Sequence, residues 1–133
     1  MSDVAEERPS RRVLIVEDDE AGREALRRCV ERAGYTVVTA DTVPQAMGHL
    51  VNGWRPDAVL LDYMLPGLNG GAFLRALRNL ELPVRVAIVT AAWESVEKNP
   101  DVAALRPDAI LRKPLIFADV LDFLEAREIQ SRE

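Results

Sequence analysis

The sequence predicts an α/β fold: a doubly wound domain in which helices cover both faces of a five-stranded parallel sheet. Short apolar runs alternate with amphipathic helical patterns five times along the chain. Each run is continuously apolar, as strands buried on both faces are, and such strands form parallel sheets. Right-handed crossovers between parallel strands place the helices on both faces.

The first strand and helix follow a short polar segment. Residues 12–16 form an apolar run that ends in acidic residues, which predicts a buried strand. The helix that follows ends at Gly34. Its apolar face should consist of residues 22, 25, 26, 29, 30 and 33, with Cys29 as a small core residue. Its charged residues are expected to form a solvated face: Arg23, Glu24, Arg27 and Arg28.

The second strand is expected at residues 36–39, and a helix follows it. Asp41 or Thr42 can cap this helix, and Pro44 lies in its first turn. Gly53 comes after its end. Its apolar face should consist of Val43, Ala46, Met47, Leu50 and Val51.

The third strand is expected at residues 57–61 and the fourth at 84–89. Between them, Asn69-Gly70 opens a helix, and Pro83 ends the segment. The apolar face of that helix should consist of Phe73, Ala76, Leu77 and Leu80.

The last third of the chain contains a weak helical pattern, a strand and a final helix. Asn99-Pro100 interrupts the pattern at residues 93–105, and residues before proline avoid helical backbone angles, so this helix should be short or broken. The fifth strand is expected at 109–111. The final helix should bury Phe117, Val120, Leu121 and Leu124.

Length and composition limit the possible functions. The chain has 133 residues, 48% of them hydrophobic, which predicts one domain at residues 11–126 with flexible tails at 1–10 and 127–133. A net charge of -5 argues against a broad nucleic-acid-binding face and against a polybasic membrane patch. The single cysteine suits a reducing cytoplasm, and we expect no signal peptide and no membrane span.

Polar side chains follow four of the five predicted strands, and the carboxyl edge of such a sheet is where ligands bind. The residues are Glu17 and Asp18 after the first strand, Asp62 after the third, Thr90 after the fourth and Lys113 after the fifth. Asp19, which precedes the first helix, is expected to cap it.

The chemistry of this set indicates phosphoryl transfer. The crowded carboxylates of Glu17, Asp18 and Asp62 repel one another, and oxygen ligands with room for water favour Mg²⁺. A cation and an ammonium around one carboxylate neutralise the oxygens of an incoming phosphoryl group, and Thr90 can hydrogen-bond one of them.

Over residues 11 to about 126, the chain resembles the response-regulator receiver domains of bacterial two-component signalling. The matching segments are Val13-Leu14-Ile15-Val16-Glu17-Asp18-Asp19, Leu61-Asp62-Tyr63-Met64-Leu65-Pro66-Gly67, Thr90-Ala91 and Lys113-Pro114. The resemblance implies a CheY-like, flavodoxin-like (βα)5 fold with the strand order 2-1-3-4-5. Each segment lies at the end of its own predicted strand, as the family requires.

The resemblance also implies a role for each site residue. Asp62 is the expected phosphoacceptor and forms an acyl phosphate. Asp18, Glu17 through water, Asp62 and the backbone carbonyl of Met64 are the expected Mg²⁺ ligands. Thr90 is expected to hydrogen-bond the phosphoryl group, and Lys113 to ion-pair with it. Family members hold the bond corresponding to Lys113-Pro114 in the cis form, and the same is expected here.

The resemblance implies a cytoplasmic signalling phosphoacceptor, not an enzyme with a separate substrate. Its expected donor is a histidine kinase or a histidine phosphotransfer protein. It would act on an output protein that the sequence does not identify, with no direct contact to nucleic acid or membrane, as a monomer or weak dimer. The segment after the last helix is too short for an output domain, so the chain is either a single-domain regulator or the receiver of a longer protein.

Two positions depart from the family pattern. The family has Tyr or Phe three residues before the lysine, and this chain has Ile110, so the output signal is expected to pass through the segment after Thr90. Asn99-Pro100 predicts an atypical, mobile surface at the fourth helix. Trp93, close to Thr90 in the chain, either lies at the mouth of the site or packs in the core or at its rim.

Alternative functions remain open at this point. A receiver-like interaction module without phosphate turnover is compatible with Ile110. A phosphatase of the haloacid dehalogenase type also uses an aspartate after a strand, but it requires an acid where this chain has Met64. A dinucleotide-binding domain requires a Gly-rich loop after the first strand, where this chain has acidic residues.

Overall fold

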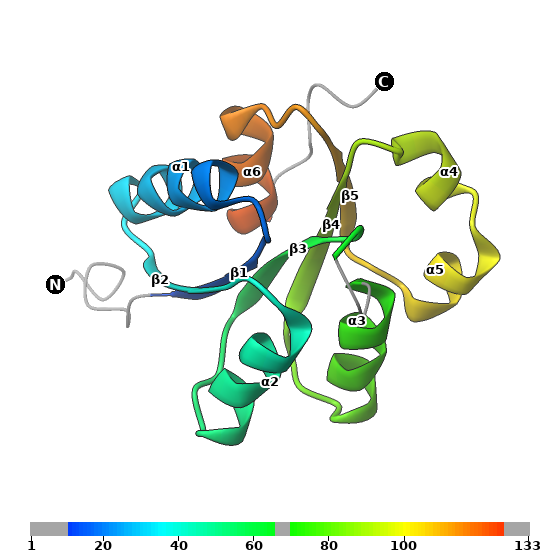
Figure 1. Ribbon diagram of the computed structural model, residues 1–133, viewed down its shortest axis with the longest axis horizontal. Helices are drawn as coiled ribbons and strands as arrows, with labels where there is room; N and C mark the ends of the chain where they lie inside the picture. Colours follow the sequence, from blue (N-terminus) through cyan, green and yellow to red (C-terminus); the bar gives the residue numbers. More distant parts are fainter. Residues whose placement is uncertain (1–10, 66–69, 127–133) are drawn as a thin grey trace, which may run out of the picture.

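The computed structural model describes residues 11–65 and 70–126, so the tails predicted at 1–10 and 127–133 and the turn at 66–69 lie outside the described residues. Five parallel strands form one sheet in the order β2-β1-β3-β4-β5. Helices α1 and α6 lie on one face, and α2, α3, α4 and α5 lie on the other (Figure 1). The predicted fold class and strand order are confirmed.

The first strand has the predicted bounds, and the other four end one residue later than predicted. Their bounds are β1 Arg12–Val16, β2 Thr36–Ala40, β3 Ala58–Asp62, β4 Arg85–Thr90 and β5 Ala109–Arg112. In β3 and β4 the extra residue is a polar site residue, because the sheet register continues through Asp62↔Val89 and Thr90↔Arg112. The backbones of Asp62 and Thr90 are therefore held by the sheet, which fixes where their side chains begin.

Six helices lie within the described residues. Their bounds are α1 Glu20–Arg32, α2 Val43–Val51, α3 Gly70–Asn79, α4 Trp93–Glu97, α5 Pro100–Leu105 and α6 Phe117–Leu124. The predicted break at Asn99-Pro100 is confirmed, because α4 ends before it and α5 begins after it. Asn99 has extended backbone angles, and its side chain accepts a hydrogen bond from the N–H of Asp101, so it caps α5. The mobility of this segment stays a prediction.

The buried residues form two clusters, one on each face of the sheet. Several predicted apolar positions are wrong, because each helix presents only a narrow stripe to the sheet. In α1 only Leu26 and Val30 are buried, and Cys29 is half-buried. Residues 22, 25 and 33 of the predicted face are exposed.

Other residues predicted as apolar lie at or just beyond helix ends and are exposed. Val51, Leu80 and Phe117 are 79%, 53% and 45% exposed. Leu74 and Phe123, which the predicted faces omitted, are fully buried. None of the helices within residues 11–65 and 70–126 has the length and apolar character needed to cross a membrane.

Candidate functional site

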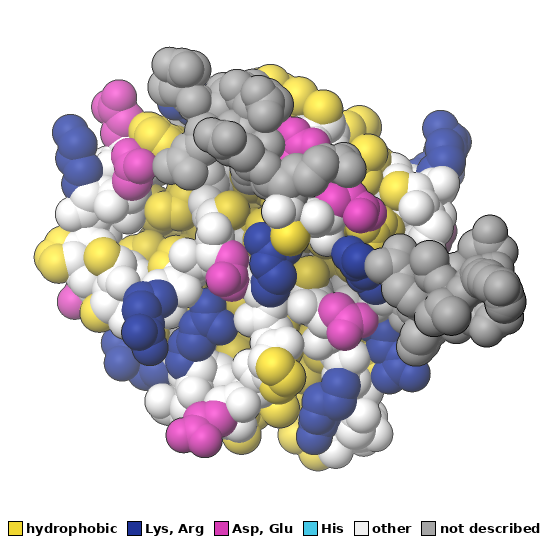
Figure 2. Space-filling view, turned by 180° about the vertical axis from the view of Figure 1, so that it is seen from behind, with side chains coloured by type: hydrophobic (Ala, Val, Ile, Leu, Met, Phe, Trp, Pro, Cys, Tyr) yellow, Lys and Arg dark blue, Asp and Glu magenta, His cyan; other side chains and the backbone are white. Residues whose placement is uncertain are grey.

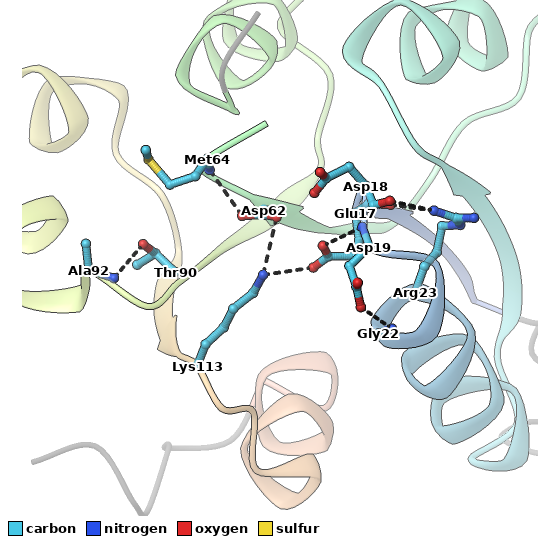
Figure 3. A network of polar contacts seen from close by, with 10 residues as sticks. All are labelled: Glu17, Asp18, Asp19, Gly22, Arg23, Asp62, Met64, Thr90, Ala92 and Lys113. Carbon is cyan, nitrogen blue, oxygen red and sulfur yellow. Dashed lines mark hydrogen bonds and ion pairs between the residues drawn. The ribbon is translucent and has the colours of Figure 1, made fainter. Parts of the chain in front are cut away.

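Two buried carboxylates lie at the carboxyl edge of the sheet. Asp62, the last residue of β3, is 5% exposed, and Glu17, directly after β1, is 7% exposed. Asp18 is exposed beside them. One carboxylate oxygen from each of the three lies within 4.8 Å of the others (Figure 3). The structure therefore brings together the three acids that the sequence predicted as metal ligands.

The loop between β1 and α1 is held by hydrogen bonds of its own residues. The N–H of Glu17 donates to the carbonyl of Ala40 at 3.0 Å, which extends the pairing of β1 with β2. The Asp19 carboxylate accepts from the N–H of Gly22 at 2.7 Å, so Asp19 caps α1 as predicted. The N–H of Asp19 donates to Oε2 of Glu17 at 3.1 Å and so orients one of the site carboxylates.

Lys113 bridges the two buried carboxylates. Its Nζ lies 3.0 Å from Oε1 of Glu17 and 3.3 Å from Oδ2 of Asp62. The Lys113-Pro114 bond is cis, as predicted. The backbone N–H of Lys113 donates to the carbonyl of Thr90 at 2.9 Å, which ties the residue after β5 to the end of β4.

Burial and charge act in opposite directions on the pKa values of Glu17 and Lys113. Burial, the largest influence, raises the pKa of Glu17 above its ordinary value, and the charge of Asp62 adds to this, although hydrogen bonds from Asp19 and Lys113 act against it. Burial alone lowers the pKa of Lys113, but hydrogen bonding to Glu17 and the charges of both carboxylates outweigh burial, and the net pKa is raised. A further positive charge beside Glu17 would therefore stabilise its ionised carboxylate.

Thr90 and Met64 flank Asp62. Thr90 is 1% exposed, and its Oγ1 accepts a hydrogen bond from the N–H of Ala92 at 3.0 Å. The N–H of Met64 donates to Oδ1 of Asp62 at 3.1 Å, and the Met64 side chain is 66% exposed. Figure 3 shows Glu17, Asp18, Asp62 and Thr90 gathered on the side of the sheet edge that the Lys113 ammonium reaches.

Gly70 is a site residue that the sequence analysis treated only as a helix start. A Cβ at this position would lie 2.7 Å from the carbonyl oxygen of Asp62 and 3.0 Å from the Cα of Tyr63. The N–H of Gly70 also donates to the carbonyl of Tyr63 at 2.9 Å. Only glycine fits here without moving the backbone that carries Asp62. The Asn69-Gly70 pair was the one signal in the sequence, and it does not reveal a contact with β3.

Trp93 is half-buried and lines a hollow that reaches Lys113. Its Nε1 donates to the carbonyl of Ile110 at 2.9 Å, and the Arg112 guanidinium lies over its ring at 4.9 Å from the centroid. A hollow of about 390 Å³ is lined by Trp93, Arg112, Lys113 and residues 91, 92, 94 and 95. The indole thus connects the segment after Thr90 to the backbone of Ile110, the position where the family has an aromatic residue.

The donor set fits a divalent cation. The candidate side-chain ligands are all carboxylate oxygens, which suit hard cations such as Mg²⁺, and two of them are buried beside a single ammonium. The exposed carboxylate of Asp18 leaves one side open to solvent, so water can complete an octahedron.

Comparison with known proteins gives consistent results. The family model of the response regulator receiver domain matches residues 13–125. Response regulator MprA from Mycobacterium sp. (strain KMS) is 37% identical over 117 residues, which are 86% of this chain and 49% of that protein. MprA from Mycobacterium avium (strain 104) is 35% identical over 117 residues, 86% of this chain and 50% of that protein. The chain spans about half the length of the curated relatives it matches.

Solved structures with this fold include chemotaxis response regulator CheY4 of Vibrio cholerae. It superimposes with a TM-score of 0.79 at 25% identity, over 89% of this chain and 98% of that one. A CheY-like receiver domain protein from Methanospirillum hungatei gives a TM-score of 0.80 at 25% identity, over 89% and 93% of the two chains.

Proposed function

The chain belongs to the response-regulator receiver family of two-component signalling, and from this membership we propose that it accepts a phosphoryl group on Asp62. One observation carries the proposal. The Asp62 carboxylate is buried at the end of a central strand, with two further acids within 4.8 Å and an ammonium 3.3 Å away. A carboxylate arranged in this way can accept a phosphoryl group, because the ammonium and a cation held by the acids would offset the negative charge of the phosphoryl oxygens.

The reaction is a displacement at phosphorus. A carboxylate oxygen of Asp62 attacks the phosphorus of a phosphohistidine, and the P–N bond breaks. Its electron pair stays on the imidazole nitrogen, which leaves with the donor protein. The product is an acyl phosphate on Asp62. Later attack of water on phosphorus breaks the new P–O bond. This restores the carboxylate of Asp62 and releases inorganic phosphate.

The neighbouring residues divide the remaining tasks. Glu17, Asp18, Asp62 and the carbonyl of Met64 would hold Mg²⁺, which supplies positive charge opposite the phosphoryl oxygens. Lys113, already paired with Asp62, would transfer its ion pair to a phosphoryl oxygen. Thr90 would exchange its bond to the N–H of Ala92 for donation to another phosphoryl oxygen.

The proposed donor is a histidine kinase or a histidine phosphotransfer protein, and the proposed output is contact with another protein. The receiver domain would span residues 11–126 and work in the cytoplasm as a monomer or weak dimer. It would have no enzymatic activity beyond its own phosphorylation and dephosphorylation. On the face seen in Figure 2, basic and acidic side chains are interspersed, and the chain carries a net charge of -5. Neither feature suits direct binding to nucleic acid.

A second candidate is an interaction module that does not turn over phosphate. Ile110, in place of the family aromatic residue, is the observation that favours it. The bond from Trp93 to the carbonyl of Ile110 counts against it, because it gives the segment after Thr90 another route to β5.

Intact mass distinguishes these candidates. The protein is incubated with Mg²⁺ and acetyl phosphate and is then weighed by mass spectrometry. A gain of one phosphoryl group that requires Mg²⁺ and is lost in Asp62→Asn supports the proposed function. No gain with acetyl phosphate or other phosphodonors, together with no binding of Mg²⁺, favours the interaction module.

A further inference from the structure

We propose that Arg23 is a positioning residue of the metal site, and this inference rests on the proposed function. Its guanidinium holds the peptide groups of Glu17 and Asp18 from behind, so that the two carboxylates face Asp62. The helical pattern predicted Arg23 on a solvated helix face. In the structure the residue is half-buried and its side chain folds back onto the β1–α1 loop.

Arg23 contacts the backbone of both loop acids. Its Nη1 lies 2.9 Å from the carbonyl oxygen of Glu17 and 3.4 Å from that of Asp18. A guanidinium that donates to a neutral carbonyl makes a charge-assisted hydrogen bond, which is stronger than a neutral one. Figure 3 shows the guanidinium on the far side of the loop from Asp62. The two carbonyls therefore point away from the site.

The base of Arg23 is itself fixed. It lies in the first turn of α1, and its backbone N–H donates to the carbonyl of Asp19 at 2.8 Å. The cap made by Asp19 to Gly22 holds the same turn. The arginine thus links a rigid helix start to the two peptide groups between β1 and α1.

Asp18 depends most on this link. The Glu17 carboxylate has direct hydrogen-bond partners, the N–H of Asp19 and Lys113. The Asp18 carboxylate is exposed, and the peptide that carries it sets where its side chain begins. Groups that orient metal ligands from behind typically contribute about 10- to 100-fold to metal affinity. We therefore expect loss of the guanidinium to raise the Kd for the cation about tenfold.

Charge and positioning make opposite predictions, which makes the inference testable. A positive charge near the site repels a divalent cation. If charge were the only influence of Arg23, removing the guanidinium would therefore lower the Kd for the cation. Removing a group that positions the ligands raises the Kd. Arg28 on the same helix carries the same charge on an exposed side chain and provides the matched control.

The experiment measures cation affinity directly. The 133-residue chain is titrated with Mn²⁺, and the free ion is followed by electron paramagnetic resonance; Mg²⁺ then displaces the bound Mn²⁺. The variants are Arg23→Met, which keeps the aliphatic stem, Arg23→Lys and Arg28→Ala, each checked for folding by circular dichroism. We expect a Kd about tenfold higher in Arg23→Met and two- to threefold higher in Arg23→Lys. Arg28→Ala should stay within about twofold.

A second readout separates positioning from general damage. In Arg23→Met the Mg²⁺ concentration needed for half-maximal phosphorylation by acetyl phosphate should rise about tenfold, while the rate at saturating Mg²⁺ stays near that of the wild type. A Kd in Arg23→Met equal to or below that of the wild type overturns the inference. If that variant does not fold, an unchanged Kd in Arg23→Lys overturns it.

Failure of the inference differs from failure of the proposed function. If the wild-type protein binds neither Mn²⁺ nor Mg²⁺, the metal site itself is wrong, and the role of Arg23 falls with it. If the wild type binds the cation and is phosphorylated while the Arg23 variants match it, only the inference about Arg23 is wrong.

Discussion

Lys113 Nζ lies 3.3 Å from Oδ2 of Asp62, and the same ammonium lies 3.0 Å from Oε1 of Glu17. One positive charge therefore pairs with two buried carboxylates. A divalent cation bound at these acids would neutralise part of their charge and so weaken their ion pairs with the ammonium. Lys113 would then be available to a phosphoryl group on Asp62, without any large movement of its backbone.

Lys113→Met should separate cation binding from the response to phosphorylation. It removes a charge that competes with Mg²⁺, so the Kd for Mg²⁺ should stay equal or fall, because like charges repel. The conformational change on phosphorylation, measured by tryptophan emission, should be reduced severalfold, because the phosphoryl group loses its ion pair. Loss of Mg²⁺ binding with an intact emission change would contradict the role given to Lys113.

Trp93 should report phosphorylation by its fluorescence. The chain has two tryptophans, so Trp54→Phe leaves Trp93 as the only one. If Thr90 releases the N–H of Ala92 to reach the phosphoryl group, the segment that carries Trp93 moves relative to Ile110 and Arg112. The emission intensity or maximum of Trp93 should then change with Mg²⁺ and acetyl phosphate.

The matched control for this measurement is Trp93→Phe. It leaves Trp54, which precedes β3 and therefore lies at the opposite end of the sheet from Asp62. We expect little change in its emission. A silent Trp93 in protein that mass spectrometry shows to be phosphorylated would mean that the signal does not pass through this residue.

Arg78 should be important for stability. From α3 it donates to the carbonyls of Leu105, the last residue of α5, and of Arg106 after it, and to that of Val84 before β4. Arg78→Ala leaves these partly buried carbonyls without their donor and should lower the free energy of unfolding by about 2–3 kcal/mol. Arg75→Ala, at an exposed position of the same helix, should change it by less than about 0.5 kcal/mol. Urea unfolding measures both, and equal effects would contradict the account of Arg78.

Tyr35 should make stability depend on pH in alkaline solution. Burial, with the hydrogen bond to Glu125, raises the pKa of Tyr35 to about 12. Between its ordinary pKa of about 10 and 12, the unfolded chain loses the phenol proton while the folded chain keeps it. Stability should therefore fall as pH rises through this window, by up to about 2 kcal/mol more than in Tyr35→Phe. Parallel stability curves for the two proteins between pH 10 and 12 would contradict this.

Much of the fold and the site could be predicted because their signals are local. Continuous apolar runs mark strands of a parallel sheet, and the polar residue after each run lies at the sheet edge where ligands bind. Asp62, Thr90 and Lys113 were found in this way, and the structure places them around the same point. The Asn99-Pro100 break followed from the backbone limits that proline imposes on the residue before it.

The errors concern contacts between segments that are distant in the chain. The face of α6 was misplaced because Phe117, at the start of the helix, is exposed, whereas Phe123 is buried in the core. Nothing in the sequence indicated that a Cβ at position 70 would collide with the carbonyl of Asp62. Arg23 looked like one of several charged residues on a solvated helix, and only the geometry shows that its side chain turns back to the loop.

The most direct test of the central claim identifies the phosphorylated residue itself. Protein treated with Mg²⁺ and acetyl phosphate is reduced with borodeuteride, which converts an aspartyl phosphate to deuterium-labelled homoserine, and is then digested and sequenced by mass spectrometry. We predict labelled homoserine at position 62 and at no other acid. Label at Asp18 or Asp57, or a phosphorylated protein that yields no homoserine, would contradict the assignment of Asp62 as the phosphoacceptor.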